Sequence, residues 1–311
     1  MIAFLFPGQG SQAIGMARAF YENSPAARRV VDEANDVLGF DLRRLMFEGP
    51  EAELVLTANT QPAVLTASVA AAAACAERGL RPGLAAGHSL GEYSAFVVAG
   101  ALAFPDAVRT VRKRGEFMQE AVPIGTGAMA ALMGMELDKV DEVCREAADG
   151  EVVEVANVNS EGQIVIAGHR AAVERALALA TGRGGRKSVM LPVSAPFHTS
   201  LMTGAADRLA RELESVPVLD PAIPIARNVD GEFVRRAADV TPSLLRQVAS
   251  PVRWTACVER LAHEGATTFV EVGPGRVLTG LLRRIVDGAR GHSIEDPLTL
   301  DKTLSALAVA R

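Results

Sequence analysis

A serine flanked by glycines is the feature of this 311-residue chain with the clearest chemical meaning. The apolar segment Leu84–Gly87 leads directly into Gly87-His88-Ser89-Leu90-Gly91, which has the pattern G-x-S-x-G. Glycines on both sides allow a sharp turn from a strand into a helix, which exposes the serine hydroxyl and turns backbone N–H groups towards it. Such a serine can attack a carbonyl carbon. A chain with 28 glycines can also contain the pattern by chance, so the hypothesis requires a base near Ser89.

The candidates for that base are His88, His169, His198, His263 and His292. His88 is next to the serine, and in an extended backbone its side chain points the opposite way. Three others fall at expected helix ends or in a polar segment, where histidines are commonly structural. His198 differs, because it follows Pro192 and Pro196 on a restrained loop ahead of a predicted helix. We predict that His198 is the base, although a structural histidine would also fit this pattern.

A second glycine-rich loop, 6–13, follows the first apolar segment of the chain. Its spacing Gly8-x-Gly10-x-x-Ala13 formally matches a dinucleotide-binding fingerprint. A Rossmann unit would require a second strand that ends in an acidic residue about 20 residues later. Instead, the sequence 30–33 continues a helical pattern, so the match is weak. No G-K-[S/T] follows either glycine cluster, which excludes a P-loop.

The elements that must position these residues follow an alternating pattern. Three strand-like runs are each followed by glycine and then by helical periodicity: Ile2–Phe6, Leu84–Gly87 and Thr268–Val272. This alternation predicts a parallel sheet with helices on both faces, in which the loops after the strands form the active site. Ser24-Pro25 supplies the start of a packing helix, and Ala63–Ala76 predicts a buried helix.

The middle of the chain predicts a separate small unit. Its expected strands and helices have the order βαββαβ and cover 128–133, 139–148, 152–155, 163–167, 171–180 and 188–191. This is the order of the ferredoxin-like split βαβ unit. We therefore expect an α/β fold in which a large domain, residues 1–124 and 193–311, carries an inserted ferredoxin-like subdomain at residues 125–192.

The composition limits the classes of protein to which the chain can belong. Hydrophobic residues make up 49% and charged residues 22%, as in soluble globular proteins. The net charge of −5 offers no general attraction to nucleic acid or to an anionic membrane, so an acidic partner must dock on a local basic patch. Cys75, Cys144 and Cys257 lack metal or redox spacing, which predicts reduced core thiols. With no signal-peptide pattern and no run long enough to span a membrane, we expect a cytoplasmic protein.

Seven motifs occur together and in order along the chain. They are Phe6–Gln12, Gly87–Ser94, Arg114–Gln119, Asn157–Ser160, Ser194–His198, Gln247 with Pro251–Trp254, and Glu271–Gly275. This set resembles the malonyl-CoA:acyl carrier protein transacylases of fatty acid synthesis, and the resemblance extends from Ile2 to about Leu307. It implies an α/β-hydrolase-like large domain with a parallel sheet, the ferredoxin-like insertion, and an active site in the cleft between them.

The resemblance also implies roles for residues of the catalytic centre. Ser89 resembles the nucleophile of the family and His198 resembles its base. The backbone N–H groups of Leu90 and Gln9 resemble its oxyanion hole. Gln247 resembles the residue whose backbone carbonyl orients the histidine, so that no triad acid is required.

Three further residues resemble those that contact the substrate. Arg114 resembles the arginine that binds the free carboxylate of malonate. Chemistry supports this independently, because a planar guanidinium binds a carboxylate through two hydrogen bonds, and malonyl differs from acetyl by that carboxylate alone. Without the resemblance, an arginine in Arg112-Lys113-Arg114 would fit a solvated helix face. Phe197 resembles a residue that crowds an α-methyl branch, and Asn157 is expected to contact the substrate.

The implied reaction transfers malonyl from malonyl-CoA, through a malonyl-serine ester, to the phosphopantetheine thiol of acyl carrier protein. The resemblance implies no cofactor and no metal, and we expect a monomer. Three alternatives remain open. One is a serine thioesterase or esterase with a triad acid, and the second is an acyltransferase of a polyketide synthase that uses the same residues. The third is a non-catalytic subunit that docks the carrier protein.

Overall fold

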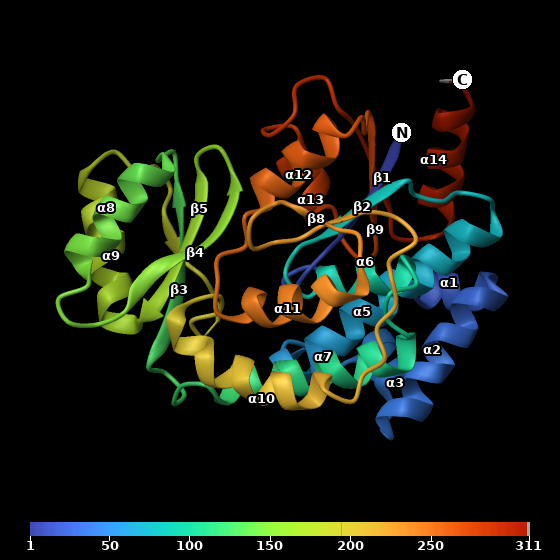
Figure 1. The fold of residues 1–311 in the computed structure, drawn as a ribbon, viewed down its shortest axis with the longest axis horizontal. Helices are drawn as coiled ribbons and strands as arrows, with labels where there is room; N and C mark the ends of the chain where they lie inside the picture. The colour runs from blue at the N-terminus through green and yellow to red at the C-terminus, as the bar shows by residue number, and fades with distance from the viewer. Residues whose placement is uncertain (194, 310–311) are drawn as a thin grey trace.

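The computed structural model describes residues 1–193 and 195–309, which form two units built around separate β-sheets (Figure 1). The larger sheet has the order β10-β9-β1-β2-β7-β8. Its strands are β1 (Ile2–Phe6), β2 (Leu84–Gly87), β7 (Ile225–Ala226), β8 (Phe233–Val234), β9 (Thr268–Val272) and β10 (Arg290–Ile294). All neighbouring pairs are parallel except β7 with β8. The three predicted strands, β1, β2 and β9, are confirmed.

Strand β10 was not predicted, because the segment around His292 was described only as polar. The strand forms the edge of the larger sheet, and its first two residues are exposed. An edge strand has one unpaired side and does not need the mostly apolar sequence of β1 or β9, which are buried on both faces. The polar sequence therefore concealed a strand.

Helices cover both faces of the larger sheet. They are α1 (Arg18–Asn23), α2 (Pro25–Leu38), α3 (Leu42–Glu48), α4 (Glu51–Leu54), α5 (Thr57–Glu77), α6 (Gly91–Val98), α7 (Phe104–Glu120), the 3₁₀ helix η1 (Ser200–Met202), α10 (Thr203–Leu213), α11 (Ala237–Val248), α12 (Trp254–His263), α13 (Val277–Leu282) and α14 (Pro297–Val309). As expected, α2 begins at Pro25 and is capped by Ser24, whose Oγ accepts a hydrogen bond of 3.1 Å from the N–H of Ala27.

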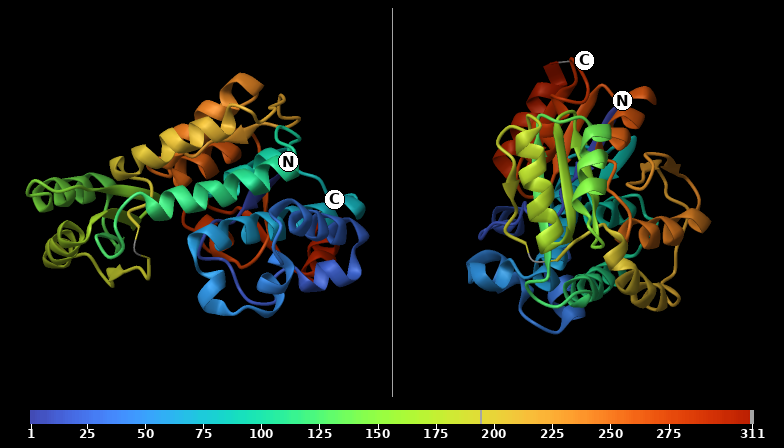
Figure 2. Two further views of the ribbon diagram at one scale, coloured as in Figure 1. Left: turned by 90° about the horizontal axis from the view of Figure 1, so that it is seen from below. Right: turned by 90° about the vertical axis from the view of Figure 1, so that its left-hand side faces the viewer.

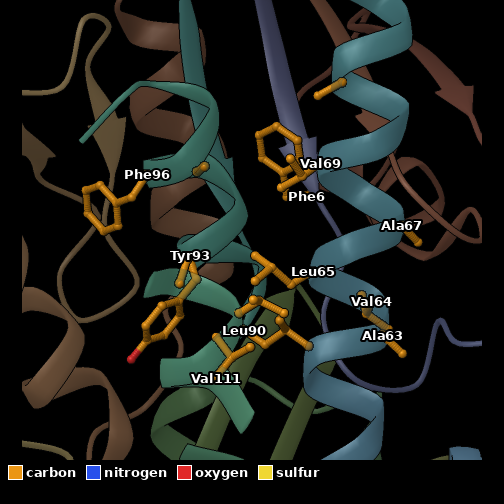
Figure 3. Packing of buried hydrophobic residues seen from close by; sticks show 14 of the residues in the cluster. Phe6, Ala63, Val64, Leu65, Ala67, Val69, Leu90, Tyr93, Phe96 and Val111 are labelled. Carbon is orange, nitrogen blue, oxygen red and sulfur yellow. The ribbon is translucent and has the colours of Figure 1, made fainter. Parts of the chain in front are cut away.

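The expected buried helix is α5, which crosses the core of the larger unit and packs against α2 and α7. Its many alanines allow neighbouring helices to approach closely. Figure 3 shows side chains of α5, α6 and α7 meeting beside β1, with Leu65, Leu90 and Val111 in one cluster. Because Leu90 directly follows Ser89, this packing anchors the start of α6 at the serine turn.

The smaller unit is an antiparallel sheet of order β4-β5-β3-β6 with α8 (Leu137–Ala147) and α9 (Arg170–Gly182) at its outer end (Figures 1 and 2). Its strands are β3 (Gly127–Met133), β4 (Val153–Ser160), β5 (Gln163–His169) and β6 (Val189–Met190). The chain order βαββαβ and this strand order are ferredoxin-like. The predicted fold class, a parallel α/β sheet with a ferredoxin-like insertion, is therefore confirmed.

Strand β4 is longer than predicted, because it continues past Val155 to Ser160. Asn157 and Asn159 interrupt the apolar pattern, and this part of the strand faces the larger unit. There the N–H of Val158 donates to the carbonyl of Val252, and the N–H of Val252 donates to the carbonyl of Ala156, both at 2.9 Å. The edge of β4 therefore ties the small sheet to the larger unit.

Cys75, Cys144 and Cys257 are buried free thiols on α5, α8 and α12, as predicted. Within residues 1–193 and 195–309, no helix is both long and apolar enough to cross a membrane.

Candidate active site

Ser89 lies in the turn between β2 and α6, at the carboxyl end of the parallel strand. Its backbone has a φ of 52°, a left-handed conformation that is strained for a residue with a side chain. A Cβ at Gly87 would lie 1.9 Å from the backbone of Gly91, and a Cβ at Gly91 would lie 2.1 Å from the carbonyl oxygen of Phe6. Only glycine fits at these two positions, which explains the G-x-S-x-G pattern physically.

Asn228, which follows β7, holds this turn in place. Its side-chain Oδ1 accepts a hydrogen bond of 2.7 Å from the N–H of Ser89, and its Nδ2 donates to the carbonyl of Gly87 at 2.7 Å. Asn228 was not predicted, because the two-residue strand that places it gives almost no pattern. The only signal was a polar side chain after a short apolar run.

His198 contacts the serine directly. The Oγ of Ser89 donates to Nε2 of His198 at 2.7 Å, and Nδ1 of His198 donates to the backbone carbonyl of Gln247 at 2.8 Å. Because a carbonyl can only accept, the proton belongs on Nδ1, and Nε2 is left free to accept the serine proton. The φ of His198 is 62° and its side chain is 4% exposed, so the surrounding structure fixes the ring.

The environment of His198 favours the neutral imidazole. Burial, followed by the positive charge of Arg114, lowers the pKa of His198 from 6.5 to about 3, while the Gln247 carbonyl opposes the shift. In the described part of the chain, no carboxylate accepts a hydrogen bond from the ring, so the site holds a serine–histidine pair oriented by a carbonyl.

Arg114 is buried beside the pair, although it directly follows the exposed Lys113 on α7. Its side chain is 1% exposed, and Nη2 donates to the Oγ of Ser89 at 3.1 Å and to Oε1 of Gln247 at 2.8 Å. Nη1 donates to Oε1 of Gln61 at 2.8 Å, and the guanidinium lies 5.7 Å from the ring centre of Tyr93. Arg114 is therefore not on a solvated helix face, which was the alternative interpretation.

A buried hydrogen-bond network supports Arg114 from behind. Nε2 of Gln247 donates to the carbonyl of Ser89 and to Oε2 of Glu92, both at 2.9 Å. Glu92 also accepts from Ser243 Oγ at 2.7 Å and from the Asn228 N–H at 2.9 Å. Burial raises the pKa of Glu92, and these hydrogen bonds oppose the rise. Glu92 belongs to one of the seven motifs, but no role was predicted for it.

The serine opens into a pocket of about 130 Å³ between the two units. It is lined by Gln9, Gln61, His88, Ser89, Leu90, Arg114, Met118, Met129, Asn157, Leu191, Val193, Phe197 and His198. Among the described residues, the backbone N–H groups of Gln9 and Leu90 have no protein acceptor. These two donors, together with Asn157 and Phe197, meet the serine in one space, so the predicted site residues converge there.

Gln61 was not among the predicted residues, although it faces Arg114 across the pocket. It lies in α5, whose apolar character gave no hint of a polar contact, and only a glutamine beside a helix-breaking proline marked the position. Ser194, which begins one of the motifs, lies outside the described residues.

The other histidines do not approach the serine oxygen in the way His198 does. His88 does line the pocket, contrary to the expectation that it points away, and its Nε2 lies 2.8 Å from Oδ1 of Asn159. His169 accepts a hydrogen bond from the N–H of Val152, and His263 is the last residue of α12. Within residues 1–193 and 195–309, no group of three or more His, Cys, Asp or Glu side chains is arranged to hold a metal ion.

Comparison with known proteins places the chain in a family. The acyl transferase domain family matches residues 3–296. A malonyl CoA-acyl carrier protein transacylase of Bacillus subtilis (strain 168) is 47% identical over 307 residues, which cover 98% of this chain and 97% of the relative. The chain belongs to the malonyl CoA-acyl carrier protein transacylases. It is therefore an acyltransferase.

Solved structures agree with this family membership. The acyl-carrier-protein S-malonyltransferase of Burkholderia pseudomallei has a TM-score of 0.95 at 47% identity, over 98% of this chain and 99% of that one. A malonyl-transacylase solved with its type II polyketide synthase acyl carrier protein has a TM-score of 0.95 at 45% identity, over 98% and 99%. The transacylase family thus shares the whole two-unit fold, including the insertion that closes the pocket.

Proposed function

We propose that this protein transfers the malonyl group of malonyl-CoA to the phosphopantetheine thiol of acyl carrier protein and thereby supplies fatty acid synthesis. The observation that carries the proposal is the buried guanidinium of Arg114, 3.1 Å from the nucleophilic oxygen. Among the described residues no carboxylate pairs with it. A buried cation at that distance suits an acyl group that carries its own carboxylate two bonds from the reacting carbonyl.

In the first half-reaction, Oγ of Ser89 bonds to the thioester carbon while Nε2 of His198 takes its proton. The free N–H groups of Leu90 and Gln9 stabilise the oxyanion. The carbon–sulfur bond then breaks, and His198 returns the proton to the CoA thiolate. A malonyl-serine ester remains, with its carboxylate on Arg114.

In the second half-reaction, His198 takes the proton of the phosphopantetheine thiol as the sulfur attacks the ester carbonyl. The bond to Ser89 breaks, and His198 protonates the leaving oxygen. The Nδ1–H bond to the Gln247 carbonyl keeps the ring in one tautomer through both steps and stabilises the imidazolium. Phe197 and Asn157 line the pocket beside Ser89. We expect Phe197 to exclude an α-methyl branch on the acyl group.

An enzyme that serves a polyketide synthase would use the same residues, and the similarity to the polyketide carrier-protein complex leaves that pathway as the second candidate. A thioesterase is less consistent with the site, because His198 faces a carbonyl rather than a triad acid. The experiment that tests the proposal compares two rates after loading with malonyl-CoA. We expect transfer to holo-acyl carrier protein to exceed hydrolysis of the acyl-enzyme by far. Hydrolysis as fast as transfer would indicate a thioesterase.

The low pKa of His198 leads to a prediction about pH. The base must be unprotonated in the free enzyme, and a pKa of about 3 keeps it so in weakly acidic solution. We therefore expect kcat/KM for malonyl loading to change little between about pH 8 and about pH 5. The measurement is a pH profile with rapid quenching. A loss of activity with a midpoint near 6.5 would show that His198 titrates as an ordinary histidine and would contradict the described environment.

Docking of the carrier protein requires local positive charge, because the enzyme has a net charge of −5. The sequence contains two clusters of basic residues. One is Arg283 and Arg284, and the other is Arg183, Arg186 and Lys187. Arg183 is already paired with Glu146. Arg283 and Arg284 are exposed at the end of α13, a helix that contacts β4 of the small unit, and neither forms an ion pair within the described residues. We therefore propose that Arg283 and Arg284 receive the acidic carrier protein.

Replacing Arg283 and Arg284 by glutamate should raise KM for the carrier protein, flatten its salt dependence and leave loading from malonyl-CoA nearly unchanged. A matched control reverses Arg29 and Arg44, which are exposed on α2 and α3 at the end of the molecule away from the small unit (Figure 1). Both variants change the net charge equally. The docking proposal would be contradicted if both charge-reversal variants affected the carrier-protein step equally. It would also be contradicted if reversal of Arg283 and Arg284 slowed both half-reactions equally.

We further propose that the enzyme acts in the cytoplasm as a monomer. The support is the sequence composition and the free, buried cysteines.

A further inference from the structure

Glu92 is a fully buried carboxyl group. Burial raises its pKa, whereas its three hydrogen-bond donors and the charge of Arg114 favour the charged form. Its side chain is 0% exposed, and its two oxygens accept hydrogen bonds from Ser243 Oγ, the Asn228 N–H and Gln247 Nε2. Two of these donors are N–H groups, which could not accept a hydrogen bond from a protonated carboxyl group. A buried charge is costly unless an opposite charge lies nearby, so Glu92 requires a partner.

The nearest buried cation is Arg114, and the two charges are joined through one amide group. Nη2 of Arg114 donates to Oε1 of Gln247 at 2.8 Å, and Nε2 of the same amide donates to Oε2 of Glu92 at 2.9 Å. Neither charged side chain has an ion pair within 4 Å in the described part of the chain. The carboxylate and the guanidinium thus balance each other across the Gln247 amide without touching.

We propose that Glu92 is a positioning residue, the internal counter-charge of Arg114, held one amide away so that the guanidinium stays free to bind a substrate carboxylate. The inference rests on the proposed function for the identity of that substrate. Direct contact would satisfy Arg114 and compete with the substrate. From the far side of the Gln247 amide, Glu92 balances the charge of Arg114 before the substrate arrives, without forming an ion pair that the substrate carboxylate would have to break.

The same arrangement fixes the orientation of Gln247. Its amide oxygen faces a donor and its amide nitrogen faces a carboxylate, so a flipped amide would place like groups together on both sides. Because the backbone carbonyl of Gln247 orients His198, the charge pair and the catalytic base share one support. Glu92 therefore acts on the reaction through Gln247, without contacting the substrate.

The test is a double-mutant cycle on thermal unfolding of the substrate-free enzyme. Glu92→Gln keeps the shape and can keep the acceptor for Gln247, but it removes the charge. Arg114→Met keeps most of the length of the side chain and removes the opposite charge. Each single variant leaves one buried charge unbalanced, and we expect each to lower the unfolding midpoint by about 5 °C or more. The double variant should lower the unfolding midpoint by clearly less than the sum of the two single effects.

A control cycle pairs Arg114→Met with Ser243→Ala, which removes a hydrogen bond to Glu92 without removing charge. Because both residues belong to one hydrogen-bond network, some coupling is expected, but it should be clearly smaller than that between Glu92→Gln and Arg114→Met. Additive effects of Glu92→Gln and Arg114→Met would overturn the proposal. If the Glu92→Gln variant does not fold, the double variant with Arg114→Met decides. A double variant that folds supports the charge pair, and one that does not fold overturns it.

A binding measurement separates this inference from the proposed function. In a Ser89→Ala background, Glu92→Gln removes a negative charge that repels the incoming carboxylate, so calorimetry should show malonyl-CoA binding about tenfold more tightly and acetyl-CoA binding unchanged. The double-mutant cycle can show coupling while Glu92→Gln changes the binding of malonyl-CoA and acetyl-CoA equally. That result would support the charge pair and contradict the role of Arg114 in recognising malonyl. Weaker malonyl-CoA binding without coupled unfolding would overturn the charge pair itself.

Discussion

Replacing Ser89 by alanine is expected to abolish both the acyl-enzyme and malonyl transfer while leaving the protein folded. The substitution removes the nucleophilic oxygen, for which the pocket offers no substitute. The turn itself depends on Gly87, Gly91 and the side chain of Asn228, which bonds to backbone groups that alanine retains. Intact-mass analysis after incubation with malonyl-CoA, together with thermal unfolding, measures both expectations.

The matched control for Ser89 is Ser243→Ala, which also removes one buried serine hydroxyl near the site but leaves the nucleophile. That variant should still form the acyl-enzyme. A malonyl adduct on the Ser89→Ala protein at the peptide that contains residue 89 would refute the assignment of the nucleophile.

Replacing Arg114 by alanine is expected to separate malonyl from acetyl transfer. Loss of a desolvated, charge-assisted contact should cost malonyl transfer about 3 kcal/mol, or about a hundredfold in kcat/KM. Acetyl has no carboxylate, so its transfer should hold or improve. The ratio of the two rates is the quantity to measure, because any general weakening of the fold affects both substrates.

Lys113→Ala provides the control on the same helix. Lys113 is exposed and pairs with Glu116, so its loss removes a cation one position away without touching the pocket. The malonyl-to-acetyl ratio of this variant should be unchanged. If malonyl and acetyl rates fall together in Arg114→Ala, Arg114 is structural and the carboxylate is recognised elsewhere.

The parts of the fold that the sequence predicted are those with a strong local pattern. Strands β1, β2 and β9 are buried on both faces, so they appear as predominantly apolar runs, although β9 also contains the buried Glu271. The turn at Ser89 was visible because close backbone contacts permit only glycine at two fixed positions. In contrast, β10 and the second half of β4 carry polar residues for reasons of tertiary structure, and periodicity alone did not reveal them.

The candidate site divides in the same way. Ser89 and His198 could be proposed from residue type and loop context, and the resemblance supplied Arg114 and Gln247. Pattern analysis could not predict that Gln247 uses its carbonyl for His198 and its amide for Arg114 and Glu92, because these contacts join residues more than 40 positions apart. They exist only once α7, α11 and the loop before η1 meet around the serine turn.

The central claim is that malonyl passes through an ester on Ser89, and mass spectrometry of the acylated enzyme tests it most directly. The protein is incubated with malonyl-CoA, quenched in acid, digested and analysed before and after addition of holo-acyl carrier protein. We predict that one malonyl group appears on the oxygen of Ser89 and that it leaves this residue as malonyl appears on the phosphopantetheine thiol. Transfer to the carrier protein without any malonyl on Ser89 at any time point would contradict the account.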